Sequence, residues 1–229
     1  MTPDLCIVMP VLNEADQLAP ALARLQVVRT RGVRLVVVDG GSNDGTLAMA
    51  QGLCDLALVA PRGRAVQMNA GARALPAKAY LFLHADTRLP DNADSLIRDA
   101  WGQGKVWGRF DVRIESRRWA LRLVSFAMNL RSRWTGIATG DQAIFVQHDA
   151  FQAVGGYPDI ALMEDIAISR ALKRHGPPAC LRQAVHTSAR RWQRHGVLKT
   201  IWLMWRLRAA YFFGADPRQL ARQYGYRPR

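Results

Sequence analysis

The sequence predicts an α/β fold built around a mostly parallel central sheet, because short apolar runs alternate with helix-like stretches. Residues 33–38 form a β-branched run with almost no polar side chain, which predicts a strand covered on both faces. Residues 13–28 carry leucine and alanine at helical spacing. Apolar residues make up 49% of the chain and charged residues 22%, enough for a sizeable core.

The predicted elements alternate along most of the chain. Strands are expected at residues 5–9, 33–38, 56–60, 79–83, 107–114 and 143–146. Helices are expected at residues 13–28, 44–52, 65–74, 91–101, 163–175 and 193–213. Pro10 stops the first strand, Pro90 stands where a helix begins, and Gly176-Pro177-Pro178 stops the helix at 163–175.

Two units are expected, a main domain at residues 1–192 and a C-terminal helical extension at residues 193–229. The extension is rich in aromatic residues, but Lys199 and Arg206 lie close together on a helical projection whereas Arg208 falls nearly opposite. A helix on a membrane surface is therefore one interpretation, and docking on the main domain or on a second copy in a homodimer are the others. Residues 197–213 are too short and too charged to span a bilayer.

The net charge of +14 is concentrated in the second half of the chain. Residues 1–105 carry 11 Lys+Arg against 10 Asp+Glu, and residues 106–229 carry 21 against 8. Nucleic acid, an acidic membrane surface or a phosphorylated substrate could each face this half. Three widely spaced cysteines and the lack of a secretion signal indicate a cytoplasmic protein with reduced thiols.

Polar side chains follow four consecutive predicted strands. They are Asn13-Glu14, the glycine-rich turn at residues 39–45, Arg62-Gly63-Arg64, and His84-Ala85-Asp86. Because ligands bind at the carboxyl ends of strands in an open parallel sheet, these groups are expected at one edge. The glycine-rich turn lacks both the dinucleotide and the P-loop spacing, and a tight turn with Asp44 capping a helix explains it equally well.

Asp86 places a lone carboxylate at the exit of a buried strand. Mg²⁺ or Mn²⁺ commonly takes one or two protein carboxylates, with diphosphate oxygens and water completing the shell. A divalent cation is therefore the expected cofactor, the alternative being that Asp86 caps the turn before Pro90.

These residues together resemble family 2 glycosyltransferases of the GT-A fold, a Rossmann-like fold that binds nucleotide-diphospho-sugars. The resemblance rests on Pro-Val-Leu-Asn-Glu at residues 10–14 and on Asp-Gly-Gly-Ser-Asn-Asp-Gly-Thr at residues 39–46. It continues through residues 63–71, through His-Ala-Asp-Thr at residues 84–87, and through Glu164-Asp165. It covers about residues 5 to 195. Within the family, the chain is most similar to small bacterial members known as selenodomain-associated transferases.

The resemblance implies a role for each matched residue. Donor binding falls to Pro10, Asn13, Glu14, Asp39, Gly41, Arg64, Asn69, His84, Ala85 and Asp86. Asp86 would also hold the cation. Asp165, with Glu164 beside it, matches the general base of an inverting transfer. A first-turn acidic pair that complements a helix dipole is the structural alternative for these two carboxylates.

Two departures from the family pattern bear on metal binding and processivity. His84 replaces the usual first carboxylate of the Asp-x-Asp motif. Arg190-Arg191-Trp192 lacks the glutamine that accompanies this element in processive members, so transfer of a single sugar is expected. His186 lies where some GT-A enzymes recruit a metal ligand, although a lone histidine is more often structural.

An acceptor pocket is expected near Arg109 and near Gly140-Asp141-Gln142, although turn formation explains these residues almost as well. A UDP-sugar is the first donor to consider, and the acceptor is anionic or linked to a lipid at the inner face of the membrane, with at most peripheral membrane contact. A nucleotidyltransferase is the main alternative. Nucleic-acid binding is disfavoured because the arginines are scattered and no recognition motif is present.

Overall fold

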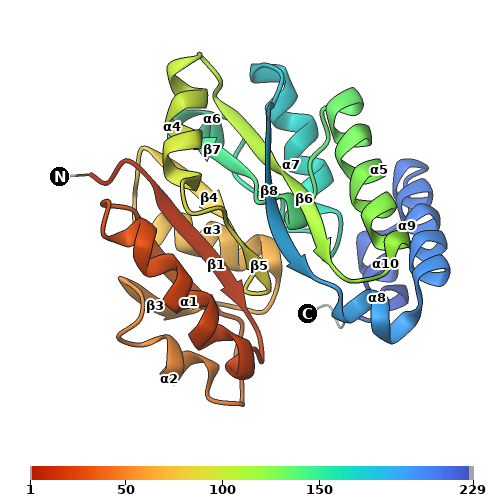
Figure 1. Cartoon of the computed structure of the whole chain (residues 1–229), viewed down its shortest axis with the longest axis horizontal. Coiled ribbons are helices and arrows are strands. Elements are labelled where there is room, and N and C mark those ends of the chain that lie inside the picture. Colours follow the sequence, from red (N-terminus) through yellow and green to blue (C-terminus); the bar gives the residue numbers. More distant parts are fainter. Residues whose placement is uncertain (1, 227–229) are drawn as a thin grey trace.

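The computed structural model describes residues 2–226, which fold around an eight-stranded sheet with helices on both faces (Figure 1). The strands are β1 (Cys6–Val11), β2 (Arg34–Asp39), β3 (Leu56–Val59), β4 (Ala79–Phe82), β5 (Thr87–Arg88), β6 (Trp107–Glu115), β7 (Phe145–Gln147) and β8 (Ala179–Ser188). The helices are α1 (Ala15–Arg29), α2 (Thr46–Ala50), α3 (Arg64–Ala74), α4 (Ala93–Gly102), α5 (Trp119–Thr135), α6 (His148–Ala153), α7 (Glu164–Leu172), α8 (Arg190–His195), α9 (Val197–Phe212) and α10 (Pro217–Gln223).

The sheet order is β3-β2-β1-β4-β7-β6-β8-β5. Strands β1 to β4 are parallel to one another where they pair, and β6 pairs in parallel with β8. Strand β7 is antiparallel to both β4 and β6, and β5 is antiparallel to β8. The mostly parallel sheet of the sequence prediction is confirmed, and the carboxyl ends of β1, β2 and β4 meet at one edge.

Alternate residues of the central strands fill two cores on opposite faces of the sheet. Ile7 and Met9 of β1 belong to the same cluster as Leu22 of α1, whereas Val8 belongs to the cluster that contains Met68 of α3. The period of two in a strand sends successive side chains to opposite faces, so a strand that is apolar throughout must be covered twice. This two-sided burial was predicted for residues 33–38.

The second half differs from the prediction in several elements. Helix α5 was not predicted, because arginines interrupt its apolar pattern. Strand β8 was not predicted either, because only part of this strand is buried. The single helix expected at 193–213 is also wrong, since Gly196, with φ 81°, separates α8 from α9. A left-handed residue of this kind ends a helix and turns the chain.

The C-terminal helices pack on the main body of the molecule. Leu207 of α9 and Leu220 of α10 join one cluster with Met163 and Ile166, which stand at the start of α7. Docking on the main domain, one of the alternatives for this segment, is therefore observed for the inner side of α9. Within residues 2–226, every helix is too short or too polar to cross a lipid bilayer.

Gly108 of β6 lies where there is no room for a side chain. A Cβ at this position would stand 2.4 Å from the carbonyl oxygen of Ala179 and 2.5 Å from the Phe145 ring. Because the first contact is with backbone, Gly108→Ala should lower the free energy of unfolding by about 1 to 3 kcal/mol, measured by urea denaturation. Gly102→Ala at the end of α4 has open space around it and should be neutral or slightly stabilising. Equal effects of the two substitutions would contradict this description of the β6–β8 contact.

Candidate active site

The turn after β1 is joined to the turn after β2 by side-chain hydrogen bonds. The Asn13 amide N–H donates to Ser42 Oγ at 2.8 Å, and Asn13 Oδ1 accepts from the Asn43 amide at 3.0 Å. The Glu14 amide donates to Thr46 Oγ1 at 2.9 Å. Both motifs that carry the family resemblance therefore hold each other in place, and Asn13 adopts φ 52° to do so.

Asp39 and Gln67 hold the same edge of the sheet in place through hydrogen bonds of their buried side chains. Asp39 is 2% exposed, and both of its carboxylate oxygens accept from the Ser42 amide at 3.1 Å. Gln67 of α3 donates from Nε2 to the carbonyl oxygens of Val11 and Val38, each at 2.8 Å. One buried side chain thus ties α3 to the ends of β1 and β2, which places Arg64 at the mouth of the edge.

A cavity of about 270 Å³ opens at this edge. Seven predicted donor or acceptor residues line it: Pro10, Glu14, Arg64, His84, Ala85, Asp86 and Asp141. Residues from the C-terminal part also line it: Arg191, Trp192, Tyr224 and Tyr226. A larger cavity of about 650 Å³ lies at the other end of β4, near Lys78 and His148, and no predicted site residue lines it.

Arg190 of α8 stands beside two of the carboxylates in the cavity. Its Nη2 lies 3.4 Å from Glu14 Oε2 and 4.0 Å from Asp86 Oδ2. Burial raises the pKa of Glu14, and Arg190 partly offsets this effect. A guanidinium and two carboxylates thus share the part of the cavity where a diphosphate and its cation would need both kinds of charge.

His84 contacts the 3₁₀ turn that lies between α5 and β7. Its Nδ1 lies 3.5 Å from Asp141 Oδ1, and a Cβ on Gly140 would stand 2.6 Å from the His84 ring. The Gly140 amide in turn donates to Asp165 Oδ2 at 3.0 Å. Gly140 and Asp141, which belong to one short 3₁₀ turn (Gly140–Gln142), therefore link His84 to Asp165. A capping box between Thr139 and Gln142 closes this turn.

Glu164, which is buried, and Asp165, which is partly buried, open α7 as two adjacent carboxylates. Burial and, to a smaller extent, the negative charge of Asp165 together raise the pKa of Glu164 to about 7, against the opposing effect of Arg64, whose Nη1 lies 3.9 Å from Glu164 Oε1. Burial also raises the pKa of Asp165, although the amides of Gly140 and Ile166 donate to its oxygens and oppose the shift. Both carboxyl groups therefore bind a proton more readily than an exposed carboxyl group does.

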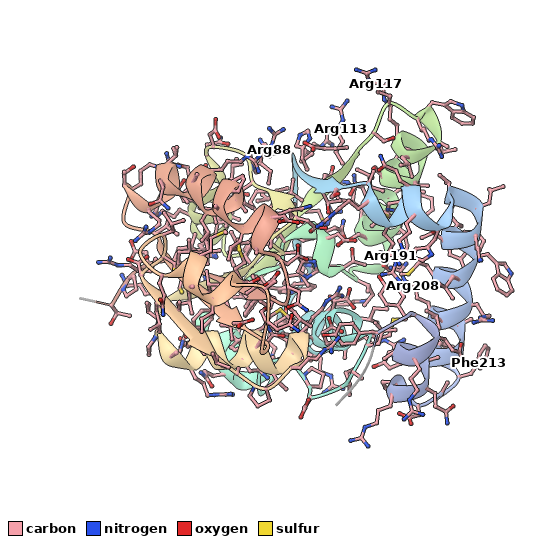
Figure 2. All side chains as sticks on the ribbon, turned by 90° about the horizontal axis from the view of Figure 1, so that it is seen from below. Arg88, Arg113, Arg117, Arg191, Arg208 and Phe213 are labelled. Carbon is pink, nitrogen blue, oxygen red and sulfur yellow. The ribbon has the colours of Figure 1, made fainter. Side chains whose placement is uncertain are left out.

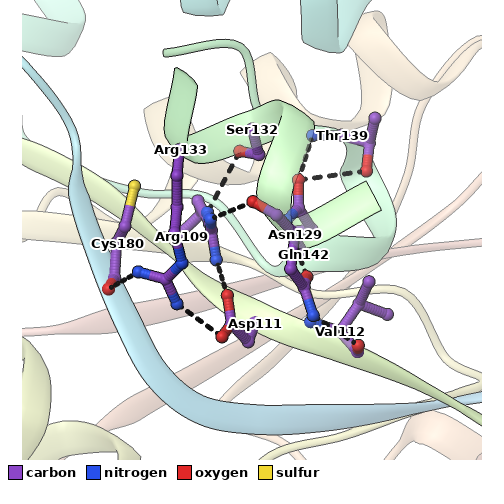
Figure 3. A network of polar contacts seen from close by, with 9 residues as sticks. All are labelled: Arg109, Asp111, Val112, Asn129, Ser132, Arg133, Thr139, Gln142 and Cys180. Atoms are coloured by element: carbon purple, nitrogen blue, oxygen red, sulfur yellow. Dashed lines mark hydrogen bonds and ion pairs between the residues drawn. The ribbon is translucent and has the colours of Figure 1, made fainter. Parts of the chain in front are cut away.

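Arg109 is not available to an acceptor. Its side chain is fully buried and is engaged by Asp111, by Ser132 Oγ at 3.1 Å and by the carbonyl of Asn129 at 3.1 Å (Figure 3). The predicted acceptor role for Arg109 is therefore wrong, because its hydrogen bonds join β6 to α5. Gln142, also predicted for the acceptor pocket, is buried in the same network and donates to Asn129 Oδ1 at 3.3 Å.

Two further predicted residues lie outside the cavity. Asn69 is engaged by the backbone of Tyr157, donating to its carbonyl at 2.7 Å and accepting from its amide at 2.9 Å. His186 pairs with Glu115 at 3.5 Å, and burial together with Arg88 lowers its pKa. Both side chains hold elements together here, and the structural interpretation of His186 is the one that its contacts favour.

Arg131 of α5 was not predicted and stands near the candidate base. Its Nε and Nη2 atoms are buried with no hydrogen-bond partner among residues 2–226. Burial lowers its pKa, and the negative charge of Asp165 opposes the shift. A buried guanidinium with unused donors is costly unless an anion meets it, so Arg131 marks a place for a negatively charged group.

The tyrosines of the C-terminal segment were also missed. Arg191 lies 3.4 Å over the Tyr224 ring, and Arg62 and Arg64 lie 5.3 and 6.0 Å from the centre of the Tyr226 ring. These cation–π contacts bring the end of the chain back over the cavity. The only signal in the sequence was the spacing of aromatic and basic residues, which does not say which partners meet.

A divalent cation would find one well-placed ligand in Asp86. Among residues 2–226, no three His, Cys, Asp or Glu side chains are grouped closely enough to hold a metal by themselves. Asp86 opens on the cavity beside Glu14, and a cation there would need diphosphate oxygens and water for its remaining ligands. This donor set fits Mg²⁺ or Mn²⁺, which keep such ligands in nucleotide sites.

The family model for glycosyl transferase family 2 matches residues 6–153. The chain belongs to this family, and its fold is the GT-A fold. It is therefore a glycosyltransferase of family 2. No curated protein sequence gives a significant match to the chain.

Several solved protein structures share this fold at low sequence identity. The mannosyltransferase PcManGT from Pyrobaculum calidifontis, solved with GDP-Man and Mn²⁺, matches with a TM-score of 0.64 and 18% identity over 99% of this chain and 70% of that chain. TarS 1-349 from S. aureus, solved with UDP-GlcNAc, matches with a TM-score of 0.66 and 14% identity, over 81% of this chain and 58% of that chain. Glucosyl-3-phosphoglycerate synthase from Mycobacterium tuberculosis was solved with Mn²⁺, UDP and glucosyl-3-phosphoglycerate. It matches with a TM-score of 0.65 and 14% identity, over 99% of this chain and 81% of that chain.

The raised pKa of Glu164 predicts a pH-dependent stability. Because the folded state favours the protonated carboxyl, this contribution is present below the ordinary pKa of 4.5 and is lost as pH rises through about 7. In the wild type, the free energy of unfolding should fall by up to about 3 kcal/mol over this pH range, and Glu164→Gln should remove this fall. The melting temperature of the variant should therefore fall less than that of the wild type between pH 5 and pH 8, two values on either side of the Glu164 titration. Asp99→Asn, at an exposed carboxylate of α4, should keep the wild-type slope.

Proposed function

We propose that this glycosyltransferase moves a single sugar, with inversion and with the help of a divalent cation, from a nucleoside-diphosphate sugar to an acceptor hydroxyl. The observation that carries the proposal is the meeting of Glu14, Arg64, His84, Asp86 and Asp141 in one cavity at the carboxyl ends of the strands. Ligands of open α/β sheets bind at this edge. A UDP-sugar is the first donor to test.

The charges around the cavity suit a diphosphate leaving group. Arg64, Arg190 and Arg191 surround carboxylates that alone would repel phosphate. A cation on Asp86 would neutralise the negative charge that develops on the diphosphate as the glycosidic bond breaks. The residues of the two joined turns, with Asp39 beneath them, would hold the nucleoside. Mn²⁺ accompanies the nucleotide in two of the solved relatives, which supports a cation here.

Asp165 is the proposed general base. Its carboxylate is fixed by the Gly140 and Ile166 amides, at 3.0 and 2.8 Å, and each oxygen keeps a lone pair for a proton. The acceptor oxygen would bond to the anomeric carbon while its proton passes to Asp165. The bond from this carbon to the diphosphate breaks on the opposite face, so the configuration inverts. A raised pKa makes a carboxylate a better acceptor for this proton.

Glu164 and Arg131 are proposed to position the reactants. Glu164 holds Arg64 at the mouth of the donor site. Arg131, with buried and unused donors near Asp165, would receive a phosphate or carboxylate on the acceptor. It takes the place first predicted for Arg109. An anionic acceptor, free or linked to a lipid, follows from this arrangement.

The setting proposed for the reaction is a bacterial cytoplasm. The three cysteines Cys6, Cys54 and Cys180 are free, which fits a reducing compartment. Release of a nucleoside diphosphate would separate this reaction from that of a nucleotidyltransferase, which releases pyrophosphate.

Loss of the Asp86 carboxylate should uncouple donor binding from the cation. UDP-, GDP- and dTDP-sugars should be screened by thermal shift with and without Mn²⁺, because a ligand that binds only the folded state raises its melting point. Asp86→Ala should lose the Mn²⁺-dependent part of the shift, with donor affinity in Mn²⁺ lowered at least about tenfold. Asp99→Ala, at an exposed carboxylate of α4, is the control. An unchanged Mn²⁺ response in Asp86→Ala would contradict the assignment.

Asp165→Asn should separate binding from transfer. The amide keeps the shape of the side chain but accepts a proton poorly, so kcat should fall about 100- to 10,000-fold with the donor Kd nearly unchanged. Hydrolysis or transfer of the sugar, followed as release of nucleoside diphosphate, is the measurement. A parallel rise in the donor Kd would instead place Asp165 in donor binding.

A further inference from the structure

Exposed large hydrophobic side chains gather at one end of the molecule. Among residues 2–226, twelve such side chains are markedly exposed, and nine of them lie on α5, on α9 or directly after α9. The other three, Val27, Met49 and Val59, are aliphatic and lie in the first 60 residues. Every exposed tryptophan and phenylalanine of this set therefore belongs to the same two helices, and a solvated surface alone does not explain the concentration.

The outer side of α5 is an aromatic and aliphatic stripe. Trp119, Leu123, Phe126 and Trp134 recur at helical spacing and are 57% to 81% exposed. Leu121, Ser125 and Ser132 form the opposite, buried side. The apolar side of this helix thus faces away from the core, the reverse of an ordinary surface helix.

Helix α9 repeats this arrangement. Leu198, Trp202, Trp205 and Phe212 are 61% to 82% exposed and share one side, while Thr200 and Leu207 are buried on the other. Phe213 directly follows the helix and is 84% exposed. Figure 2 shows Phe213 at the outer end of α9 and Arg208 on the inward side, toward Arg191.

The two stripes belong to one part of the structure. Val124 and Met128 of α5 pack in a cluster with Trp192 of α8 and Val197 at the start of α9. Figure 1 shows α5 and α9 together at the end of the molecule farthest from β3. We call the nine exposed hydrophobic side chains on these helices the α5–α9 face.

Positive charge predominates in the segments that carry this face, which lie between the exposed carboxylates of Glu115 and Asp216. Residues 116–140 carry five Arg and no Asp or Glu, and residues 189–215 carry five Arg, one Lys and no Asp or Glu. Arg117 projects outward at the turn before α5 (Figure 2). Arg206 lies 4.9 Å over the ring of Trp202, so its alkyl stem runs along an aromatic side chain while its charge is at the edge of the stripe.

We propose that the α5–α9 face binds the surface of an anionic lipid bilayer, with its tryptophans and phenylalanines at the level of the headgroups and its arginines on lipid phosphates. Tryptophan is favoured at this boundary, and basic residues beside an apolar helix side give attraction to anionic lipids. A second copy of the chain fits this face less well, because the arginines and lysine beside one face would then meet those beside the other. The helices lie on the bilayer without crossing it, as their lengths require.

Vesicle flotation tests this surface without any need for enzyme activity. The full chain should float with phosphatidylcholine vesicles that contain phosphatidylserine, and added salt should release it. Trp202→Ser with Trp205→Ser should lower the partition coefficient at least about tenfold, because both indoles lose their burial in lipid. Arg206→Gln with Lys199→Gln should weaken binding to anionic vesicles and flatten its salt dependence.

Matched controls make the result decisive. Val27→Ser with Val59→Ser removes exposed hydrophobic side chains at the other end and should bind vesicles like the wild type. Melting points within a few degrees of wild type would show that each variant is folded. Equal binding to neutral and anionic vesicles, absence of binding, or a dimer that the tryptophan substitutions dissociate would each overturn the proposal. Because donor binding is measured separately, failure here would leave the proposed reaction standing.

Discussion

The hydrogen bonds between the first two turns of the sheet are the interaction on which the rest of the site depends. Asn13 and Glu14 bond to Ser42, Asn43 and Thr46 through groups of both backbone and side chain. Gln67 then ties α3 to both strands below these turns. Three separate segments become one rigid edge, so the groups that enter the cavity are held by elements whose own positions are fixed.

On this edge the protein keeps an unusual amount of charge out of water. Glu164 is buried beside the partly buried Asp165, and the partly buried Arg64 and Arg131 are the cations near them. Such a group of charges is unfavourable without ligands, since burial disfavours every charged form in it. Raised carboxyl pKa values are the physical sign of this cost, and they are common where proton transfer takes place.

Local sequence signals predicted the first half of the molecule and much of its site, because a strand followed by a polar turn is encoded within a few residues. Asp39, Arg64 and Asp86 each follow a short apolar run, and parallel pairing brings them to the same edge. Helix α5 and strand β8 could not be predicted this way, since their order depends on contacts with distant segments. For the same reason sequence reasoning chose Arg109 and missed Arg131 and Tyr226. Which arginine is buried within its own network and which keeps free donors depends on the tertiary structure.

The break at Gly196 has a structural consequence. On one side of it stands α8, only six residues long, whose Arg191 lines the cavity and whose Arg190 lies beside Glu14. On the other side stands α9, whose long axis is ten residues longer and whose outer side is open to solvent. Any residue other than glycine is strained at this positive φ, so a substitution at Gly196 would disturb the arginines beside the cavity and the exposed side of α9 together.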